Sequence, residues 1–121
     1  MKLNKLITSV AVAALLPMTA TADSATNKAL VLEALEATLL AGNPDAVDQY
    51  FATDIIQHNP MFASGIEAQK GVIGFLGGNG DFSAEYVRVL ADDDMVAVHA
   101  IYEGFGPTPV VGFDVFRVED G

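Results

Sequence analysis

The sequence contains no cysteine and no tryptophan, and only six of its 121 residues are lysine or arginine. The absence of cysteine excludes disulfide bonds and thiolate chemistry. The few basic residues stand beside sixteen acidic ones, which gives a formal net charge of −10 at pH 7. A chain this acidic repels phosphate backbones and anionic membranes, so we expect no nucleic-acid partner.

The N-terminus combines the three parts of an export signal. Lys2 and Lys5 precede an apolar run over residues 6–16, and Ala20-Thr21-Ala22 supplies the small residues that a signal peptidase needs. The apolar run is too short to span a bilayer, which takes about 20 residues. We therefore predict that residues 1–22 are a cleaved signal peptide and that the protein is secreted or periplasmic, with no membrane attachment after cleavage.

Residues 23–121, which remain after cleavage, have the size of one modest domain. They keep all sixteen acidic residues but only four basic ones, so the net charge becomes −12. We interpret this acidity as a solubility feature rather than as a binding surface.

Helix signals fill the first half of the domain. Leucines at helical spacing predict a helix over residues 29–41. Asn43-Pro44-Asp45 is typical of the start of a second helix. Ser64 and Glu67 form a capping box, which predicts a third helix that continues to about Leu76.

The second half of the domain changes to a strand pattern. Residues 82–91, 95–103 and 110–118 are rich in Val, Phe, Tyr and Ile and predict three strands joined by hairpins. Both faces of the strand over residues 95–103 are apolar, so we expect it to be buried on both sides. Helices followed by an antiparallel meander indicate an α+β fold, with the ligand site in the hollow between helices and sheet.

Four segments carry a resemblance to a known family: Gln57-His58-Asn59-Pro60, the helix start at Gly65, Leu90–His99 (LADDDMVAVH) and Phe113–Gly121 (FDVFRVEDG). Together they resemble the SnoaL-like (polyketide cyclase-like) branch of the nuclear transport factor 2-like superfamily. The resemblance implies a cone-shaped fold in which N-terminal helices pack on a curved antiparallel sheet around an apolar pocket. It also implies a further strand after Gly121, so we expect this chain to lack the last strand of the fold.

The resemblance also implies a function. Members include polyketide cyclases, which close rings by acid/base catalysis, and related branches hold ketosteroid isomerases and epoxide hydrolases. We therefore expect a domain that binds a small hydrophobic molecule and performs cyclase- or isomerase-type chemistry without a cofactor. The alternative is a non-catalytic binding or dimerising module. We expect a homodimer, because dimers are common in the superfamily and the edge of the strand over residues 110–118 is unpaired.

Asp114 and His99 are the candidate catalytic residues. Asp114 lies in an apolar strand, where a carboxylate is costly to bury, and its alternative role is a structural ion pair or hydrogen bond. His99 lies on the preceding strand, either as a satisfied core residue or as an acid/base group. Pairing about the centre of the turn over residues 104–109 sets His99 opposite Asp114 on one face, where the two would share a proton.

Further side chains are expected to contact the ligand, namely His58, Tyr50, Met61, Phe62 and Phe116. For His58 the alternative is a role in capping a turn. A metal site built from the two histidines and Asp114 would lack the usual ligand spacing, so we expect no metal.

Overall fold

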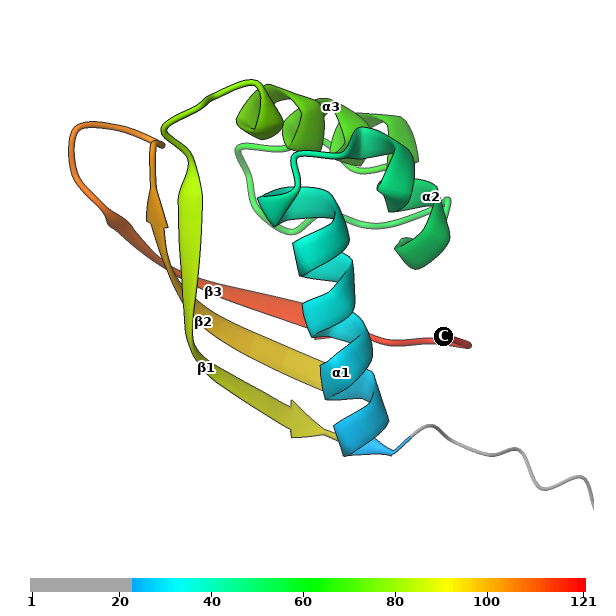
Figure 1. The fold of residues 1–121 in the computed structure, drawn as a ribbon. Coiled ribbons are helices and arrows are strands. Elements are labelled where there is room, and N and C mark those ends of the chain that lie inside the picture. Colours follow the sequence, from blue (N-terminus) through cyan, green and yellow to red (C-terminus); the bar gives the residue numbers. More distant parts are fainter. Residues whose placement is uncertain (1–22) are drawn as a thin grey trace, which may run out of the picture.

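The computed structural model describes residues 23–121, and the predicted signal peptide lies outside these residues. The chain forms α1 (Ser24–Leu35), which continues as a π-helical segment (Glu36–Leu40), and a 3-10 turn (Pro44–Ala46) that leads into the short α2 (Val47–Tyr50). The remaining elements are α3 (Ile66–Gly77), β1 (Ser83–Asp92), β2 (Met95–Glu103) and β3 (Val110–Arg117) (Figure 1).

The three strands form one antiparallel sheet in the order β1-β2-β3. Helix α1 packs across β1 and β2, and α2 and α3 lie above its C-terminal end in Figure 1. This arrangement confirms the predicted α+β fold with helices on one face of the sheet. Within residues 23–121, no helix is long and apolar enough to cross a membrane.

The core lies between α1 and the inner face of β2. Val31 and Leu35 of α1 meet the buried side chains of β2, which are Val96, Val98, Ala100 and Tyr102. The other face of β2 carries no helix, and its side chains are only partly covered. The prediction that β2 is buried on both sides is therefore wrong. Burial on both sides would require another layer against each face of the strand, and the helices cover one face.

Side chains at the start of α1 hold the turn between β1 and β2. The Asn27 side-chain amide donates a hydrogen bond of 2.9 Å to the carbonyl oxygen of Asp93. The backbone N–H of Asp93 donates to the Ser24 hydroxyl, also at 2.9 Å. Asp23 caps the helix by accepting a hydrogen bond from the Thr26 N–H. The helix thus begins five residues earlier than predicted, at a point where the sheet anchors it.

The predicted capping box does not form. The Ser64 hydroxyl instead accepts a hydrogen bond of 2.9 Å from the backbone N–H of Gln57, which closes the loop before α3. Helix α3 begins after Gly65, which adopts a positive φ of 99° and gives no side-chain cap. The Ser64 hydroxyl is therefore bonded within the loop and does not cap α3.

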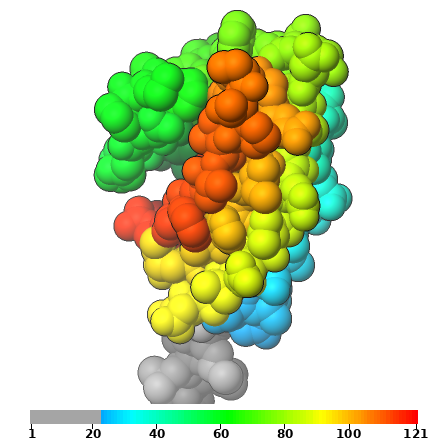
Figure 2. All heavy atoms as spheres, turned by 90° about the vertical axis from the view of Figure 1, so that its left-hand side faces the viewer, coloured from blue at the N-terminus to red at the C-terminus, as the bar shows by residue number. Residues whose placement is uncertain are grey.

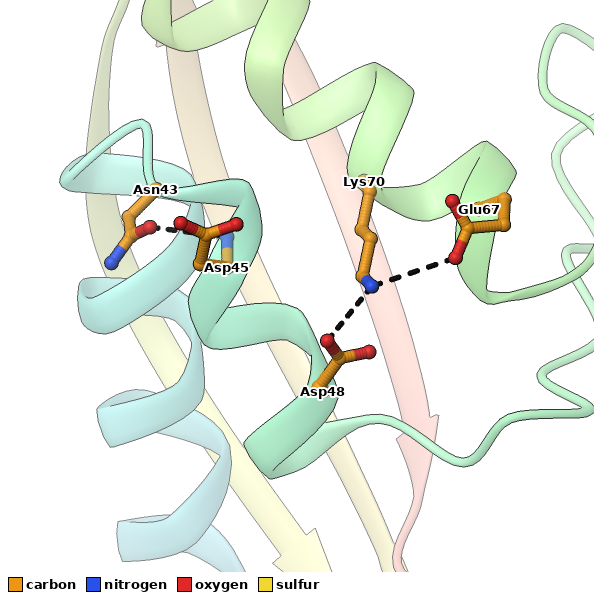
Figure 3. A network of polar contacts seen from close by, with 5 residues as sticks. All are labelled: Asn43, Asp45, Asp48, Glu67 and Lys70. Atoms are coloured by element: carbon orange, nitrogen blue, oxygen red, sulfur yellow. Dashed lines mark hydrogen bonds and ion pairs between the residues drawn. The ribbon is translucent and has the colours of Figure 1, made fainter.

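Two contacts join the helices above α1. Lys70 of α3 lies 2.8 Å from a carboxylate oxygen of Asp48 in α2 and 3.5 Å from Glu67 (Figure 3). At the C-terminal end of α3, Gly77 packs directly on the backbone of Gly42, which has a φ of +59°. A Cβ atom on Gly42 would lie 2.4 Å from the Gly77 Cα, so this crossing requires two glycines.

Candidate functional site

The inner face of the sheet carries a buried polar contact between β2 and β3. The Tyr102 hydroxyl donates a hydrogen bond to the carboxylate of Asp114. Tyr102 is 7% exposed and belongs to the core, whereas Asp114 is half-buried. The contact lies on the side of the sheet that faces the helices.

Glycine at position 112 makes this contact possible. The two partners are not opposite each other in the sheet, because Tyr102 pairs with Val110 and Asp114 pairs with Val98. The Tyr102 ring therefore has to cross β3 above Gly112. A Cβ atom at this position would lie 2.8 Å from Cε2 of the ring, so any larger residue would push the ring away.

A second tyrosine hydroxyl lies close to this pair. The Tyr86 hydroxyl is buried and has no hydrogen-bond partner among the residues that the structure describes. Burial raises the pKa of Tyr86 to about 12, and the negative charges of Asp114 and then Glu36 contribute to this rise. Tyr86 therefore stays neutral at physiological pH and keeps a proton to donate.

A β-bulge positions Tyr86. The pairing of β1 with β2 shifts between Tyr86 and Arg88, so that Val87 is an extra residue. The shift lets Tyr86 and Val89 both face the helices while Arg88 points to the outer face. Bulges of this kind are frequent next to active sites, where they redirect a side chain.

Both tyrosines hold their protons more tightly than free tyrosine does. Burial, the hydrogen bond to Asp114 and the charge of that carboxylate raise the pKa of Tyr102 well above its usual value. Phe82 stacks on the Tyr102 ring with centroids 6.2 Å apart, and Phe105 meets it edge-on at 5.7 Å. The site thus combines one carboxylate and two phenols beside an aromatic wall.

The predicted His99–Asp114 pair does not exist. His99 lies opposite Phe113, and its ring stacks on that of Phe113 with centroids 4.6 Å apart. Asp114 lies one residue further along and faces the helices. The pairing of β2 with β3 begins with Tyr102 opposite Val110. The connection between the strands therefore takes one more residue from β2 than the symmetric turn that we expected. A slip of one residue moves a side chain to the other face of the sheet.

The other predicted ligand contacts lie on different parts of the domain. Phe116 is half-buried on the inner face and packs against the core. His58 is exposed, Met61 is 82% exposed, and Phe62 is half-buried. The Tyr50 hydroxyl donates a 2.9 Å hydrogen bond to Glu33, which raises the pKa of Tyr50.

The segment that carries His58, Met61 and Phe62 forms one side of a hollow. Figure 2 shows this hollow between the green segment before α3 and the red C-terminal end of the chain. Among the described contacts, none joins the three residues to Asp114. Their role as ligand contacts therefore depends on a ligand that fills the space between them and β3.

Two other features of the domain are poorer candidates for a site. A shallow depression of about 500 Å³ lies at the loop between β2 and β3 and is lined by Asn79, Asp81 and residues 103–109. Its lining consists mostly of exposed loop residues, which provide no buried polar group. Within residues 23–121, no three acidic or histidine side chains come together in a way that could hold a metal ion.

Residues 31–121, three quarters of the chain, match the family described as the SnoaL-like domain. The chain belongs to the SnoaL-like family. This match confirms the resemblance and places the domain in the nuclear transport factor 2-like superfamily. No curated protein matches the chain.

Solved structures share the fold of this SnoaL-like domain. TsrD from Streptomyces laurentii superposes with a TM-score of 0.61 at 21% identity, over 76% of this chain and 81% of TsrD. An LEH-like epoxide hydrolase from M. tuberculosis superposes with a TM-score of 0.55 at 25% identity, over 76% of this chain and 75% of the hydrolase. Both matches confirm the α+β fold class, and the likeness to TsrD shows the fold alone.

Tyr86 and Tyr102 are not among the residues predicted for the site. A signal for Tyr102 was present, because it shares the buried face of β2 with three apolar residues, and a buried tyrosine hydroxyl usually has a hydrogen-bond partner. Gly112 lies two residues before Asp114 on the same face. Because glycine has no side chain, an aromatic ring from the neighbouring strand can lie flat over it. For Tyr86 no such signal existed, because the bulge that directs it inward is not visible as a sequence pattern.

Proposed function

We propose that this SnoaL-like domain binds a small hydrophobic molecule that carries an oxygen function, and performs acid/base chemistry on it. The observation that carries the proposal is the buried Tyr86 hydroxyl, which lacks a partner among the described residues and lies near Asp114. A buried polar group without a partner costs about 1–3 kcal/mol. A ligand oxygen that accepts a hydrogen bond from Tyr86 would remove this cost.

The three side chains would have distinct roles in this chemistry. Tyr86 donates a hydrogen bond to a carbonyl oxygen of the ligand, on which negative charge develops in the transition state. Asp114 takes the proton from the carbon next to that carbonyl. It then returns the proton to another carbon of the ligand, or to the oxygen on which charge develops as a ring closes. Tyr102 is a positioning residue, because its hydrogen bond fixes the orientation of the carboxylate.

An epoxide is the second candidate ligand. It is supported by the similarity to the LEH-like epoxide hydrolase. In this reaction a water molecule attacks an epoxide carbon and gives its proton to Asp114. The carbon–oxygen bond of the ring breaks, and the released oxygen takes the proton of the Tyr86 hydroxyl, which is then replaced by the proton that Asp114 received.

Two fluorescent probes of the same shape test the binding step. Naphthalene and 2-naphthol differ only in one hydroxyl group, so the difference in their affinities isolates the polar contact. We expect Tyr86→Phe to weaken the binding of 2-naphthol by up to about tenfold, the effect of one hydrogen bond, and to leave naphthalene unchanged. If Tyr86→Phe binds 2-naphthol as well as the wild type does, the proposal is wrong.

Deuterium exchange tests the chemical step. The ketone 2-tetralone has exchangeable hydrogens next to its carbonyl group, and their replacement in D₂O can be followed by NMR. We expect the protein to accelerate this exchange and Asp114→Asn to reduce the acceleration by roughly 10²-fold or more, as for loss of a general base. No acceleration by the wild type, together with intact 2-naphthol binding, would indicate the non-catalytic binding module.

Export belongs to the same proposal. It is supported by the charged start, short apolar run and small-residue cleavage site of residues 1–22. A cysteine-free domain is suited to an oxidising compartment, because it has no thiol to be oxidised there.

A further inference from the structure

Two carboxylates lie near the buried Tyr86 hydroxyl with no positive charge beside them. After burial, the charges of Asp114 and then Glu36 raise the pKa of Tyr86, so both carboxylates lie within electrostatic reach of the hydroxyl. Asp114 is half-buried on β3, and Glu36 is exposed on the π-helical continuation of α1. Among residues 23–121, neither of them takes part in an ion pair. Charges that are shielded from water are usually paired, so Asp114 in particular lacks a counter-charge.

The four basic residues of the described chain lie elsewhere. Lys28 precedes Glu36 by about two turns of helix, which is about 12 Å along the axis. Lys70 is held in the ion pairs that join α2 and α3 (Figure 3). Arg88 and Arg117 lie on the outer face of the sheet, which the helices do not cover. No basic side chain of this part of the protein therefore pairs with the carboxylates near the tyrosine.

The helix that carries Glu36 widens at this residue. The backbone N–H of Ala41 donates a hydrogen bond of 3.1 Å to the carbonyl oxygen of Glu36, five residues earlier. Such π-helical segments are rare and frequently lie at functional sites. Glu36 directly follows Leu35, whose side chain belongs to the core cluster against which Tyr86 packs. The exposed carboxylate of Glu36 thus lies where the core beside Tyr86 meets solvent.

We propose that the ligand of this site is a hydrophobic amine, whose ammonium group lies beside Glu36 while its oxygen function accepts the hydrogen bond of Tyr86. The inference rests on the proposed function and names the chemical class of its substrate. Glu36 supplies the opposite charge at the solvent-exposed side of the site, and Asp114 remains free for the acid/base step. A ligand that carries a carboxylate is disfavoured for the same reason, because it would meet two like charges.

Two further features favour a cationic ligand over a neutral one. The Tyr102 hydroxyl bonds to Asp114, and the charge of the same carboxylate reaches Tyr86, so two aromatic rings lie close to it. The faces of aromatic rings attract cations. Residues 23–121 carry a net charge of −12, which raises the local concentration of cations and steers them toward the domain. The acidity of the domain therefore assists ligand binding in addition to solubility.

Three fluorescent probes of similar shape test the charge preference. At neutral pH 6-(aminomethyl)-2-naphthol is cationic, 6-(hydroxymethyl)-2-naphthol is neutral and 6-hydroxy-2-naphthoic acid is anionic, and each keeps the ring hydroxyl that Tyr86 would contact. We expect the cationic probe to bind about fivefold tighter than the neutral one at low salt, and the anionic probe to bind more weakly than either. The preference should shrink in about 1 M sodium chloride, where charges are screened within about 3 Å. A cationic probe that binds no tighter than the neutral one overturns the inference.

Glu36→Gln tests whether the preference comes from this residue. We expect the variant to lower the ratio of cationic to neutral affinity by about twofold to fivefold, as for the loss of an exposed ion pair, and to bind the neutral probe as before. Glu85→Gln is the matched control, because it changes the net charge equally but lies exposed on the outer face of β1. It should leave the ratio unchanged. An equal loss in both variants would show that the net charge alone attracts the probe, and would overturn the inference.

Tyr86→Phe separates the cationic ligand from the proposed function on which it rests. The variant should weaken the three probes alike, because each offers the same ring hydroxyl, and the ratio of cationic to neutral affinity should remain. A neutral probe that binds Tyr86→Phe as well as the wild type contradicts the proposed function, whereas a wild type without charge preference contradicts only the cationic ligand. If no probe binds, the proposed function is wrong and the cationic ligand falls with it. Circular dichroism melting confirms that each variant is folded.

Discussion

Tyr102 and Asp114 are joined by a hydrogen bond although neither residue lies opposite the other in the sheet. Tyr102 reaches the carboxylate because its ring lies across Gly112, the one residue type that leaves room for it. The buried tyrosine thus finds its partner diagonally, on the next strand. This contact fixes the carboxylate beside the buried hydroxyl of Tyr86. The negative charge of the carboxylate contributes to the raised pKa of both tyrosines.

Removal of the Asp114 charge should make the tyrosines easier to ionise. The negative charge of Asp114 raises the pKa of both Tyr86 and Tyr102, so Asp114→Asn should lower both values. Tyrosinate absorbance measured against pH reports the change. Glu36→Gln is the control, because Glu36 contributes less than Asp114 to the raised pKa of Tyr86. An unchanged titration of Asp114→Asn would show that the carboxylate is not close to the two hydroxyls.

The raised pKa of the Tyr86 hydroxyl should also make the fold less stable as the pH rises into the alkaline range. The pKa of Tyr86 is about 12 in the folded state, against a usual value of 10.0. Between pH 10 and 12 the unfolded chain loses this proton while the folded chain keeps it, so the free energy of unfolding falls as the pH rises. Below pH 10 both states keep the proton, so the stability that depends on it is fully present.

Tyr86→Phe should make this decline shallower, as measured by urea unfolding at several pH values. At pH 7 the same variant should be as stable as the wild type or more stable by roughly 1 kcal/mol, because it removes a buried hydroxyl without a partner. A loss of stability at pH 7 would show that the hydroxyl makes a stabilising contact in the unliganded protein.

The strands were predicted well because their signal is local. Alternating apolar residues and two turns set β2 at residues 95–103 as predicted, and the bounds of β1 and β3 differ by one residue at most ends. Period-two alternation also sets which residues of β2 and β3 share a face, but not which face meets the helices. The alternation puts Asp114 and Phe116 on one face of β3, where both are half-buried.

The contact between strands was not predictable, because it depends on how the loop over residues 104–109 closes. A difference of one residue in that loop moved His99 away from Asp114 and brought it to Phe113. Nothing in the local sequence distinguishes the two registers. The loss of the capping box has a similar cause, since the Ser64 hydroxyl bonds to the N–H of Gln57, seven residues earlier in the loop, which the capping pattern does not reveal.

Export can be tested at the N-terminus of the chain. Protein secreted by the native host should begin at Asp23, as measured by N-terminal sequencing, because cleavage follows the small residues Ala20 and Ala22. Val12→Arg places a charge in the apolar run and should leave the protein in the cytoplasm with Met1 retained. Wild-type protein that keeps its first 22 residues would contradict the signal peptide.

Two glycines of α3 should respond to alanine in opposite directions. Gly71 lies inside the helix and is exposed, and a Cβ atom there would meet nothing within 4 Å. Gly71→Ala should therefore raise the free energy of unfolding by roughly 0.5–1 kcal/mol, because alanine loses less backbone freedom on folding.

Gly77 ends the same helix, but a Cβ atom there would lie 2.5 Å from the Gly42 Cα. The atom in contact belongs to the backbone, so no side-chain rotation can relieve the overlap, and α3 would have to move away from the turn at Gly42. We expect Gly77→Ala to lower the free energy of unfolding by roughly 1–3 kcal/mol, as overpacking does. Urea unfolding of both variants gives the comparison. If Gly77→Ala is stabilising as well, α3 does not pack as closely on the turn at Gly42 as the structure shows.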